Sequence, residues 1–475
     1  MMRRSILSLA LAASAAGGAA AQQVPNAARN VPISSRDRFY TSDQFSNTVS
    51  VVDPSTNRLV GLIRLGDVTP ANVSPLYRGQ LLVQGMGFSP NRATLAVVSI
   101  GSSSVTFIDT ATNSVKATTY VGRSPHEAFF RPDGREVWVS VRGEDYIAVL
   151  DGRNYREIGR IKVPNGPGMT IFSPDGRYGY VCSSFSPETV VIATRSRRIV
   201  GRVRQESPFC PDIAATPDGR QVWLTLKDVG RVMVFDARPP FSILRSIDTG
   251  PVTNHVNIVN NANGQFAYVT VATQNVVKVY RTSDFEQVAS IAVGSVPHGL
   301  WPSGDGTRIY VGLENGDGVA AIDTLQNRVI ATIPIGQGPQ GVAYVPNAVP
   351  SGAGAGNLVP RDEAVGSSSL TLSGSGRTQV SLFNQGPVQI LQAVAAGLTP
   401  GAHYILAMSS RADGSGPLEP LATFAANPAG SAVVNTVGPI RQVVSAAAPA
   451  DRRFLVIASG TPAQPGAVVQ VQDGP

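Results

Sequence analysis

The chain has 475 residues, of which 15% are charged, and its formal net charge is +7. Its 48 glycines and 35 prolines suit many short strands joined by turns and exclude a mainly helical protein. Lys and Arg do not gather into a block with interleaved aromatic residues, so there is no specific nucleic-acid signal.

The N-terminus has the layout of a secretory signal peptide. Arg3 and Arg4 give a positive start, residues 6–16 form an apolar run, and the alanines at 19–21 form a small-residue cleavage pattern. The run is too short to span a bilayer, and the alternative is an uncleaved anchor. We therefore predict a signal peptide over residues 1–21 and a periplasmic or secreted protein, with no transmembrane segment in the mature chain.

The main signal is an internal repeat with a period near 42 residues. A Pro-Asp-Gly turn recurs at 132–134, 174–176 and 217–219, with degenerate copies at 263–264 and 305–306. The glycines stand 42, 43, 45 and 42 residues apart, which is the length of one four-stranded propeller blade. In each repeat a strand leads into the turn, a second strand carries an aromatic residue, a third alternates and ends in Asp, and a fourth closes the unit.

These units predict an all-β fold. The expected architecture is a seven-bladed β-propeller over residues 38–346, preceded by an N-terminal extension over residues 22–37. Six complete units begin near residues 85, 126, 168, 212, 255 and 298. Residues 39–66 supply only three strands of a blade, and residues 341–345 supply the missing innermost strand. Pairing of these N- and C-terminal segments would close the ring and remove its free edges.

The repeat resembles a known family. The aromatic-Val-Thr triplets, the Pro-His-Gly at 297–299 and the Ile-Pro-Ile-Gly at 333–336 look like the YVTN-repeat family of bacterial periplasmic and surface propellers. The resemblance covers about residues 38–346. The same region is more distantly similar to the haem-binding propeller of dissimilatory nitrite reductase. It implies the fold and an exported setting, and it implies no particular activity.

The composition changes after the propeller. Residues 347–359 are rich in Gly, Ala and Pro, which is typical of a flexible linker. Alternating strands return at 370–372, 380–383, 404–408 and 454–457, so we predict a small antiparallel β-sandwich over residues 360–475. Attachment, carbohydrate contact and dimerisation are all open as its role.

The innermost strands of a propeller line its central channel, so the residues that start them share one face. Three of the four histidines in the chain fall at these starts, together with an aspartate and a glutamine. We therefore predict a ligand-binding channel mouth formed by His126, Asp212, His255, His298 and Gln340.

The imidazoles of His126, His255 and His298 suggest a transition-metal site at this mouth. Copper or zinc would suit neutral imidazole, and Asp212 could complete the shell. Haem is less favoured as the cofactor, because it would also need an axial ligand and a wide, positively charged pocket, to which Arg123 and Arg142 could contribute. The alternative is a structural role in which each imidazole caps loop carbonyls or holds water.

Other loop residues on the same face carry less information. Six carboxylates are expected to be solvated loop charges: Asp43, Asp67, Glu144, Asp145, Asp228 and Glu314. Three phenylalanines, Phe45, Phe185 and Phe209, either project as a surface for a partner or pack between blades.

Cys182 ends the second strand of the fourth blade, and Cys210 precedes the first strand of the fifth. Both positions point to the same face, so we predict a disulfide between neighbouring loops of an exported protein. The spacing is not Cys-x-x-Cys, which argues against a redox-active pair.

No catalytic motif is recognised. Gly-x-Ser-x-Gly, a phosphate-binding loop with Lys and His-Glu-x-x-His are all missing. The leading hypothesis is an exported binding or scaffold protein that presents its channel face to a protein or small-molecule ligand. The alternative is a metal- or cofactor-dependent periplasmic enzyme, or a cofactor-delivery protein, that uses the histidine cluster.

Overall fold

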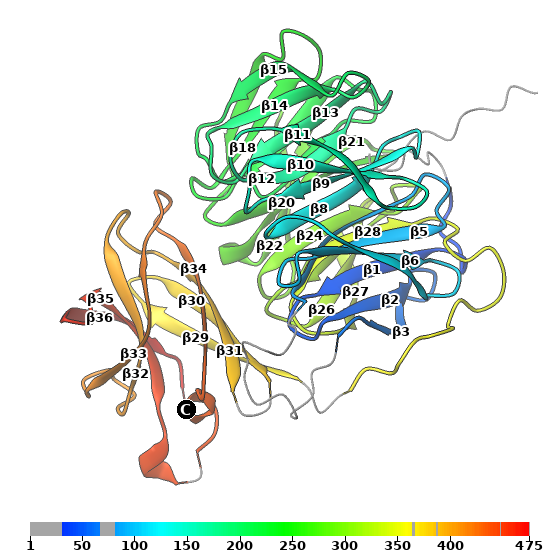
Figure 1. Ribbon diagram of the computed structural model, residues 1–475. Helices are drawn as coiled ribbons and strands as arrows, with labels where there is room; N and C mark the ends of the chain where they lie inside the picture. The colour runs from blue at the N-terminus through cyan, green and yellow to red at the C-terminus, as the bar shows by residue number, and fades with distance from the viewer. Residues whose placement is uncertain (1–30, 67–80, 363–365, 386–387, 447, 475) are drawn as a thin grey trace, which may run out of the picture.

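The computed structural model describes residues 31–66, 81–362, 366–385, 388–446 and 448–474. The predicted signal peptide and Asp67 lie outside the described residues. A ring of small sheets forms the N-terminal part, and one further sheet lies against it (Figure 1). Across the described segments, no helix has the length and apolar character needed to cross a membrane.

Within the described residues, seven four-stranded antiparallel sheets form the blades of the ring. We number the blades along the ring and give the innermost strand of each first. Blade 1 contains β28 (Pro339–Val345), β1 (Arg38–Asp43), β2 (Thr48–Asp53) and β3 (Arg58–Arg64). Blade 2 contains β4 (Val83–Phe88), β5 (Thr94–Ser99), β6 (Ser104–Asp109) and β7 (Val115–Tyr120). Blade 3 contains β8 (Pro125–Phe130), β9 (Glu136–Val141), β10 (Tyr146–Asp151) and β11 (Glu157–Lys162).

The remaining blades follow in chain order. Blade 4 contains β12 (Pro167–Phe172), β13 (Tyr178–Ser183), β14 (Glu188–Ala193) and β15 (Arg198–Arg204). Blade 5 contains β16 (Ile213–Ala215), β17 (Gln221–Leu226), β18 (Arg231–Asp236) and β19 (Ile243–Asp248). Blade 6 contains β20 (Thr253–Asn261), β21 (Gly264–Val271), β22 (Val276–Arg281) and β23 (Gln287–Ala292), with the short 3-10 helix η2 (Ala272–Gln274). Blade 7 contains β24 (Pro297–Pro302), β25 (Arg308–Leu313), β26 (Gly318–Asp323) and β27 (Arg328–Pro334).

The predicted closure of the ring is confirmed. Strand β28 pairs antiparallel with β1, so that Tyr40 lies opposite Ala343 and Phe39 lies opposite Tyr344. The innermost strands of neighbouring blades contact one another around the whole ring, including β28 with both β4 and β24. The two ends of the propeller therefore complete one blade.

The Asp-Gly turns explain how the first two strands of a blade are joined. The glycines of four such turns have a positive φ of +68° to +70°, which glycine adopts without steric cost: Gly134, Gly176, Gly219 and Gly306. In these turns the aspartate accepts a hydrogen bond from the backbone N–H two residues later, as Asp175 does from Arg177 at 3.0 Å. Aspartate and glycine thus fix the turn from both sides.

The last residue of each aromatic-Val-Thr triplet links neighbouring blades. Its hydroxyl bonds to the innermost strand of the next blade in four places: Ser42 to the carbonyl of Gln84, Ser140 to the Thr170 hydroxyl at 2.8 Å, Thr225 to the carbonyl of Asn254 at 2.7 Å, and Thr270 to the carbonyl of His298 at 2.9 Å. In blade 4 this position is Cys182, and it forms the predicted disulfide with Cys210 just before blade 5. A covalent bond therefore stands where blades 1, 3, 5 and 6 use a hydrogen bond.

The C-terminal domain is a single curled antiparallel sheet. Its eight strands among the described residues run in the order β33-β32-β35-β36-β29-β30-β31-β34. The strands are β29 (Ser367–Gly374), β30 (Arg377–Asn384), β31 (Gln389–Ala396), β32 (His403–Ser409), β33 (Leu418–Ala425), β34 (Ala432–Gly438), β35 (Phe454–Thr461) and β36 (Gln464–Gln472), with the 3-10 helices η3 (Arg441–Val443) and η4 (Pro449–Asp451). Edge strands β33 and β34 meet, and the Thr436 hydroxyl donates to the carbonyl of Leu421 at 3.2 Å. The two faces of the predicted sandwich are thus continuous in a nearly closed, barrel-like sheet.

Strands β30 and β31 of this domain dock on the end of the propeller where the innermost strands begin, which we call the channel mouth. The ring of Phe45 of blade 1 packs against that of Phe383 in a tilted arrangement with centroids 4.4 Å apart, and Val394 packs with buried residues of blades 6 and 7. Hydroxyls of Ser369 and Ser381 donate to the carbonyl of Asn315 at 3.3 and 3.0 Å. The C-terminal domain therefore covers part of the channel mouth (Figure 1).

Two expectations about the loops of this face are corrected. Phe45 does not project toward a foreign partner, because the chain's own C-terminal domain buries it. Asp43 and Glu314 are not solvated charges: Asp43 accepts hydrogen bonds from the hydroxyls of Thr41, Thr48 and Ser50, and Glu314 is only 5% exposed. Both corrections follow from the docking of the C-terminal domain and from the burial of these residues near the channel. The repeat pattern in the sequence predicts neither.

The segment 347–359 makes ordered contacts with the propeller. The Asn113 side chain donates to the carbonyls of Gly354 and Gly356 at 3.0 and 2.9 Å, and Val359 pairs with Leu62. The segment therefore follows the propeller surface. Its many glycines suit this path, because small residues allow close approach of two backbones.

Candidate functional site

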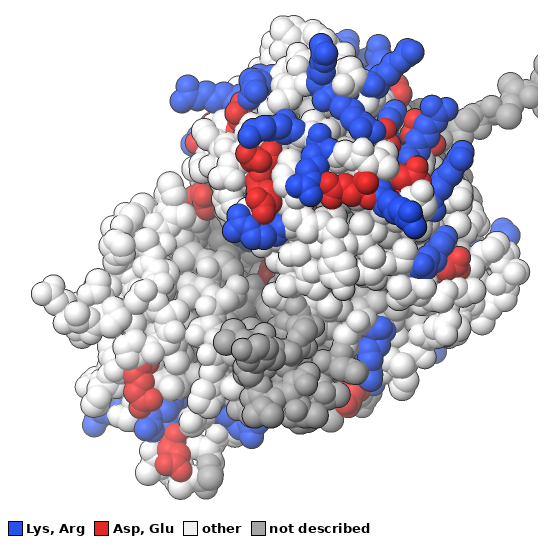
Figure 2. Space-filling view, viewed as in Figure 1, with Lys and Arg blue, Asp and Glu red and all other residues white. Residues whose placement is uncertain are grey.

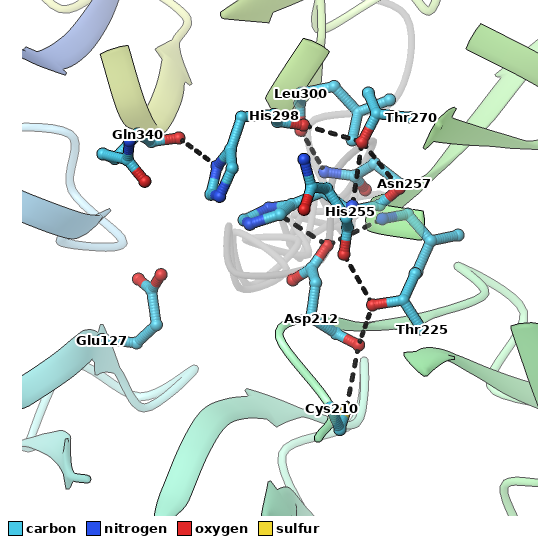
Figure 3. Close-up of polar contacts among 12 residues, drawn as sticks. Glu127, Cys210, Asp212, Thr225, His255, Asn257, Thr270, His298, Leu300 and Gln340 are labelled. Atoms are coloured by element: carbon cyan, nitrogen blue, oxygen red, sulfur yellow. Dashed lines mark hydrogen bonds and ion pairs between the residues drawn. The ribbon is translucent and has the colours of Figure 1, made fainter. Parts of the chain in front are cut away.

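Each residue predicted for the channel mouth starts an innermost strand or directly precedes one. His126 lies in β8, His255 in β20, His298 in β24 and Gln340 in β28, while Asp212 stands immediately before β16. All five are at least 94% buried. Figure 3 shows the side chains of Asp212, His255, His298 and Gln340 turned toward one another around the channel.

His255 is the centre of the closest group. Its Nδ1 lies 3.4 Å from Oδ2 of Asp212, and its ring centroid lies 4.4 Å from that of His298. The same Asp212 oxygen accepts the Val256 N–H at 2.8 Å. Blades 5, 6 and 7 thus bring one carboxyl group and two imidazoles together.

The ring of His298 is oriented by Gln340, which lies in the neighbouring blade 1. Its Nδ1 lies 3.1 Å from the carbonyl oxygen of Gln340. A carbonyl only accepts, so Nδ1 carries the hydrogen and Nε2 is left as an acceptor. The backbone carbonyl of His298 accepts the Thr270 hydroxyl, which fixes the start of β24 as well.

His126 belongs to a different part of the mouth. Its Nε2 lies 3.4 Å from Nε2 of Gln84, and its Nδ1 lies 3.9 Å from the Glu127 carboxylate, beyond hydrogen-bond distance. In the part of the chain that is described, no three His, Cys, Asp or Glu side chains gather closely enough to hold a metal ion. His126 comes from blade 3, three blades away from His255, whereas His255 and His298 come from adjacent blades, so the metal site on these three histidines stays a prediction.

Several residues at the mouth were not predicted as site residues. Gln340 Nε2 donates to Glu314 Oε1 at 2.7 Å, and Gln392 of the C-terminal domain donates to the same oxygen. Arg142, Lys227 and Glu314 each directly follow the second strand of their blade, in blades 3, 5 and 7. Aligning the repeats at that position would have revealed them.

A small cavity lies in the channel below the mouth. Its polar lining comes from Glu127, Asp212, His255 and Asn257, and its apolar lining includes Met86, Met169, Phe129 and Trp301. Its volume is about 30 Å³, enough for one or two water molecules. The Glu127 carboxyl group points into this space from the side opposite His298 (Figure 3).

No protein-family model matches the chain, and no curated protein matches it. Solved structures do. The chain is 21% identical to hydrazine synthase of Kuenenia stuttgartiensis over 56% of this chain and 90% of that chain, with a TM-score of 0.50. A functionally unknown protein from Desulfotomaculum acetoxidans is 13% identical over 65% of this chain and 98% of that one, with a TM-score of 0.54.

A third structure, the dihydro-heme d1 dehydrogenase NirN in complex with DHE, is 11% identical over 85% of this chain and 76% of that chain, with a TM-score of 0.49. At 21% and 13% identity, the first two likenesses show the fold alone. The chemistry of the mouth has to be argued from its own residues.

Burial sets the protonation of the mouth. It raises the pKa of Asp212 to about 8, although the N–H groups of Val256 and Ile213 oppose this shift. It also raises the pKa of Glu127 well above its usual value. Burial lowers the pKa of His255 far below its usual value and that of His298 to about 3. At neutral pH the imidazole of His255 is therefore neutral, and the Asp212 carboxyl group is mostly protonated.

Replacing Asp212 by asparagine is expected to change how stability depends on pH. The folded-state pKa of about 8 exceeds the unfolded value of 3.8, so this group's contribution is fully present below about pH 4 and is lost as the pH rises to about 8. Asparagine keeps an oxygen acceptor for Val256 and does not titrate. Urea unfolding across that pH range should show that the free energy of unfolding of the Asp212→Asn variant increases relative to that of the parent protein as the pH rises. A constant difference between the two proteins would contradict the raised pKa.

Proposed function

We propose that the protein is an exported binding protein that holds a small polar ligand in the channel mouth, beneath its C-terminal domain. One observation carries the proposal: buried polar atoms without a hydrogen-bond partner among the described residues gather there. They are His126 Nδ1, Asn254 Oδ1, His255 Nε2, Gln392 Oε1, and both side-chain polar atoms of Asn315. An unsatisfied buried polar atom costs about 1–3 kcal/mol, so a molecule that satisfies several of them is strongly favoured.

These atoms come from both domains. His126, Asn254 and His255 start innermost strands, Asn315 lies in a loop of blade 7, and Gln392 lies in β31. A ligand held among them would contact the propeller and the C-terminal domain together. This favours a small ligand enclosed at the mouth over a large partner on an open face, because the C-terminal domain already occupies part of that face.

Two features support the exported setting. The Cys182–Cys210 disulfide is the kind of bond that persists in oxidising compartments. The N-terminal signal pattern is the second feature. Under this proposal the mature protein works in the periplasm or outside the cell.

Native mass spectrometry of the full-length exported protein tests the binding function. The protein purified without dialysis should carry a bound molecule whose mass disappears after denaturation. The His255→Ala and His298→Ala variants should lose it, because these side chains face the mouth. The exposed His403 of the C-terminal domain supplies the matched control, and His403→Ala should keep the ligand. A mass equal to that of the polypeptide alone, with ordered water on the unsatisfied atoms in a crystal structure, would contradict the proposal.

A further inference from the structure

Two cationic side chains stand at the channel mouth. Arg142 directly follows β9 in blade 3, and Lys227 directly follows β17 in blade 5. Both are half-buried. Arg142 is close enough to interact electrostatically with Lys227, His126 and Glu127, which places its charge over the channel and not on the outer surface.

Neither cation forms an ion pair with the described residues. No carboxylate oxygen of those residues lies within 4.0 Å of either side chain. Lys227 contacts the ring of Phe209, with Nζ 5.7 Å from the centroid, and Glu314 and Asp228 influence it only from farther away. Glu314 itself is engaged by Gln340 and Gln392. Other arginines of the propeller surface are paired, as Arg231 is with Glu206 and Asp248.

The nearby carboxyl groups of the channel do not balance these two charges. Burial raises the pKa of Asp212 to about 8 and that of Glu127 well above its usual value, so both carboxyl groups carry less negative charge than solvated ones. The same burial lowers the pKa of Arg142 and Lys227, which shows that each cation is held at a cost. Neither half-buried cation has a carboxylate of the described residues within ion-pair distance, so a binding partner of opposite charge is favoured.

We infer that the ligand of the channel mouth is a small organic acid with two carboxylate groups, one bound by Arg142 and the other by Lys227. This inference rests on the binding function proposed above. The guanidinium of Arg142 can hold a carboxylate through two parallel hydrogen bonds, and Lys227 acts as a point charge. The two cations repel each other and come from blades separated by one blade, so a ligand with two anionic ends fits them better than a single small anion.

The other groups of the mouth suit the rest of such a ligand. Nδ1 of His126 can donate to a remaining carboxylate oxygen, and Oδ1 of Asn254 can accept a hydrogen bond from a hydroxyl substituent. The charges of Arg142 and Lys227 determine whether an acid binds here. The neutral groups determine which acid binds most tightly.

Isothermal titration of the full-length protein tests the inference. The probes are malonate, succinate and glutarate, with neutral succinamide and inorganic phosphate for comparison. We expect at least one dicarboxylate to bind, and the Arg142→Gln and Lys227→Gln variants each to raise its Kd by at least about 30-fold. Arg204→Gln removes an exposed arginine of β15 and should leave the Kd unchanged. Without ligand, Arg142→Gln should melt no lower than the parent protein, because it removes an uncompensated charge.

The outcomes separate this inference from the binding function. A bound molecule in native mass spectra that has no acidic group, and whose occupancy survives the Arg142→Gln/Lys227→Gln change, overturns the organic acid and leaves the binding function standing. Phosphate or succinamide binding as tightly as every dicarboxylate also overturns it. If neither a bound molecule nor any dicarboxylate binding is found, both proposals fall.

Discussion

Replacing Asp37 by alanine is expected to lower the free energy of unfolding of the propeller by about 3 kcal/mol or more. Asp37 is fully buried beside the closing pair β28–β1. Its carboxylate accepts hydrogen bonds from the Tyr344 hydroxyl at 2.6 Å and the Asn347 N–H at 2.8 Å, and also from Ser34. Alanine would leave the hydroxyl and the N–H buried without a partner at the point where the ring closes.

Tryptophan fluorescence during urea unfolding measures this effect on the propeller alone. All three tryptophans, Trp138, Trp223 and Trp301, lie in blades and are buried. Asp53→Ala, in an exposed turn of the same blade, should change the free energy by less than about 1 kcal/mol. A variant that unfolds like the parent protein would show that the closing strand does not need this anchor.

A double-mutant cycle with Tyr344→Phe isolates the closing contact. The two changes share one hydrogen bond, so the loss in the double variant should be smaller than the sum of the single losses by about 1 kcal/mol or more. Tyr404→Phe removes a hydroxyl that accepts the Thr399 N–H in the C-terminal domain and should be additive with Asp37→Ala. Additivity of Asp37→Ala with Tyr344→Phe would contradict the proposed coupling.

The fold could be predicted because its signals are local and repeated. Each Asp-Gly turn and each triplet recurs with the period of one blade, and the unmatched segments at 39–66 and 341–345 could pair only with each other. The Cys182–Cys210 bond was predictable for the same reason, since register alone places both sulfurs at one blade junction. Register even explains why this junction differs, because Cys182 stands where Ser140 and Thr225 carry hydroxyls.

The candidate site was less predictable because it depends on contacts that the repeat does not contain. Register places His126, His255 and His298 on one ring, but only His255 and His298 come from adjacent blades and meet. Glu314 was taken for a solvated charge because its partner Gln392 lies in another domain, and domain docking leaves no periodic trace in the sequence. Burial also raises the pKa of Asp212 to about 8, which no local pattern in the sequence reveals.

Removing the disulfide by Cys182→Ala/Cys210→Ala is expected to lower the free energy of unfolding by about 3–4 kcal/mol, because the bond closes a loop with a sequence separation of 28. Cys182→Ser/Cys210→Ala should recover about 1 kcal/mol of this loss. The Cys182 sulfur lies 3.4 Å from the carbonyl of residue 210, so a serine hydroxyl there can donate across the blade junction as Thr225 does toward Asn254. Urea unfolding followed by tryptophan fluorescence measures both steps.

The comparison of the two variants decides what the junction needs. If serine gives the same stability as alanine, the hydroxyl position has no energetic role, and the resemblance between blade 4 and its neighbours is one of sequence only. If neither variant differs from the parent protein, the covalent bond does not stabilise this junction. The expected order, with the disulfide most stable, serine next and alanine last, follows from a geometry in which blade 4, like blades 3, 5 and 6, is tied to the start of the next blade. That same tie positions Asp212, two residues after Cys210, beside His255, so ligand retention should fall in the same order as stability.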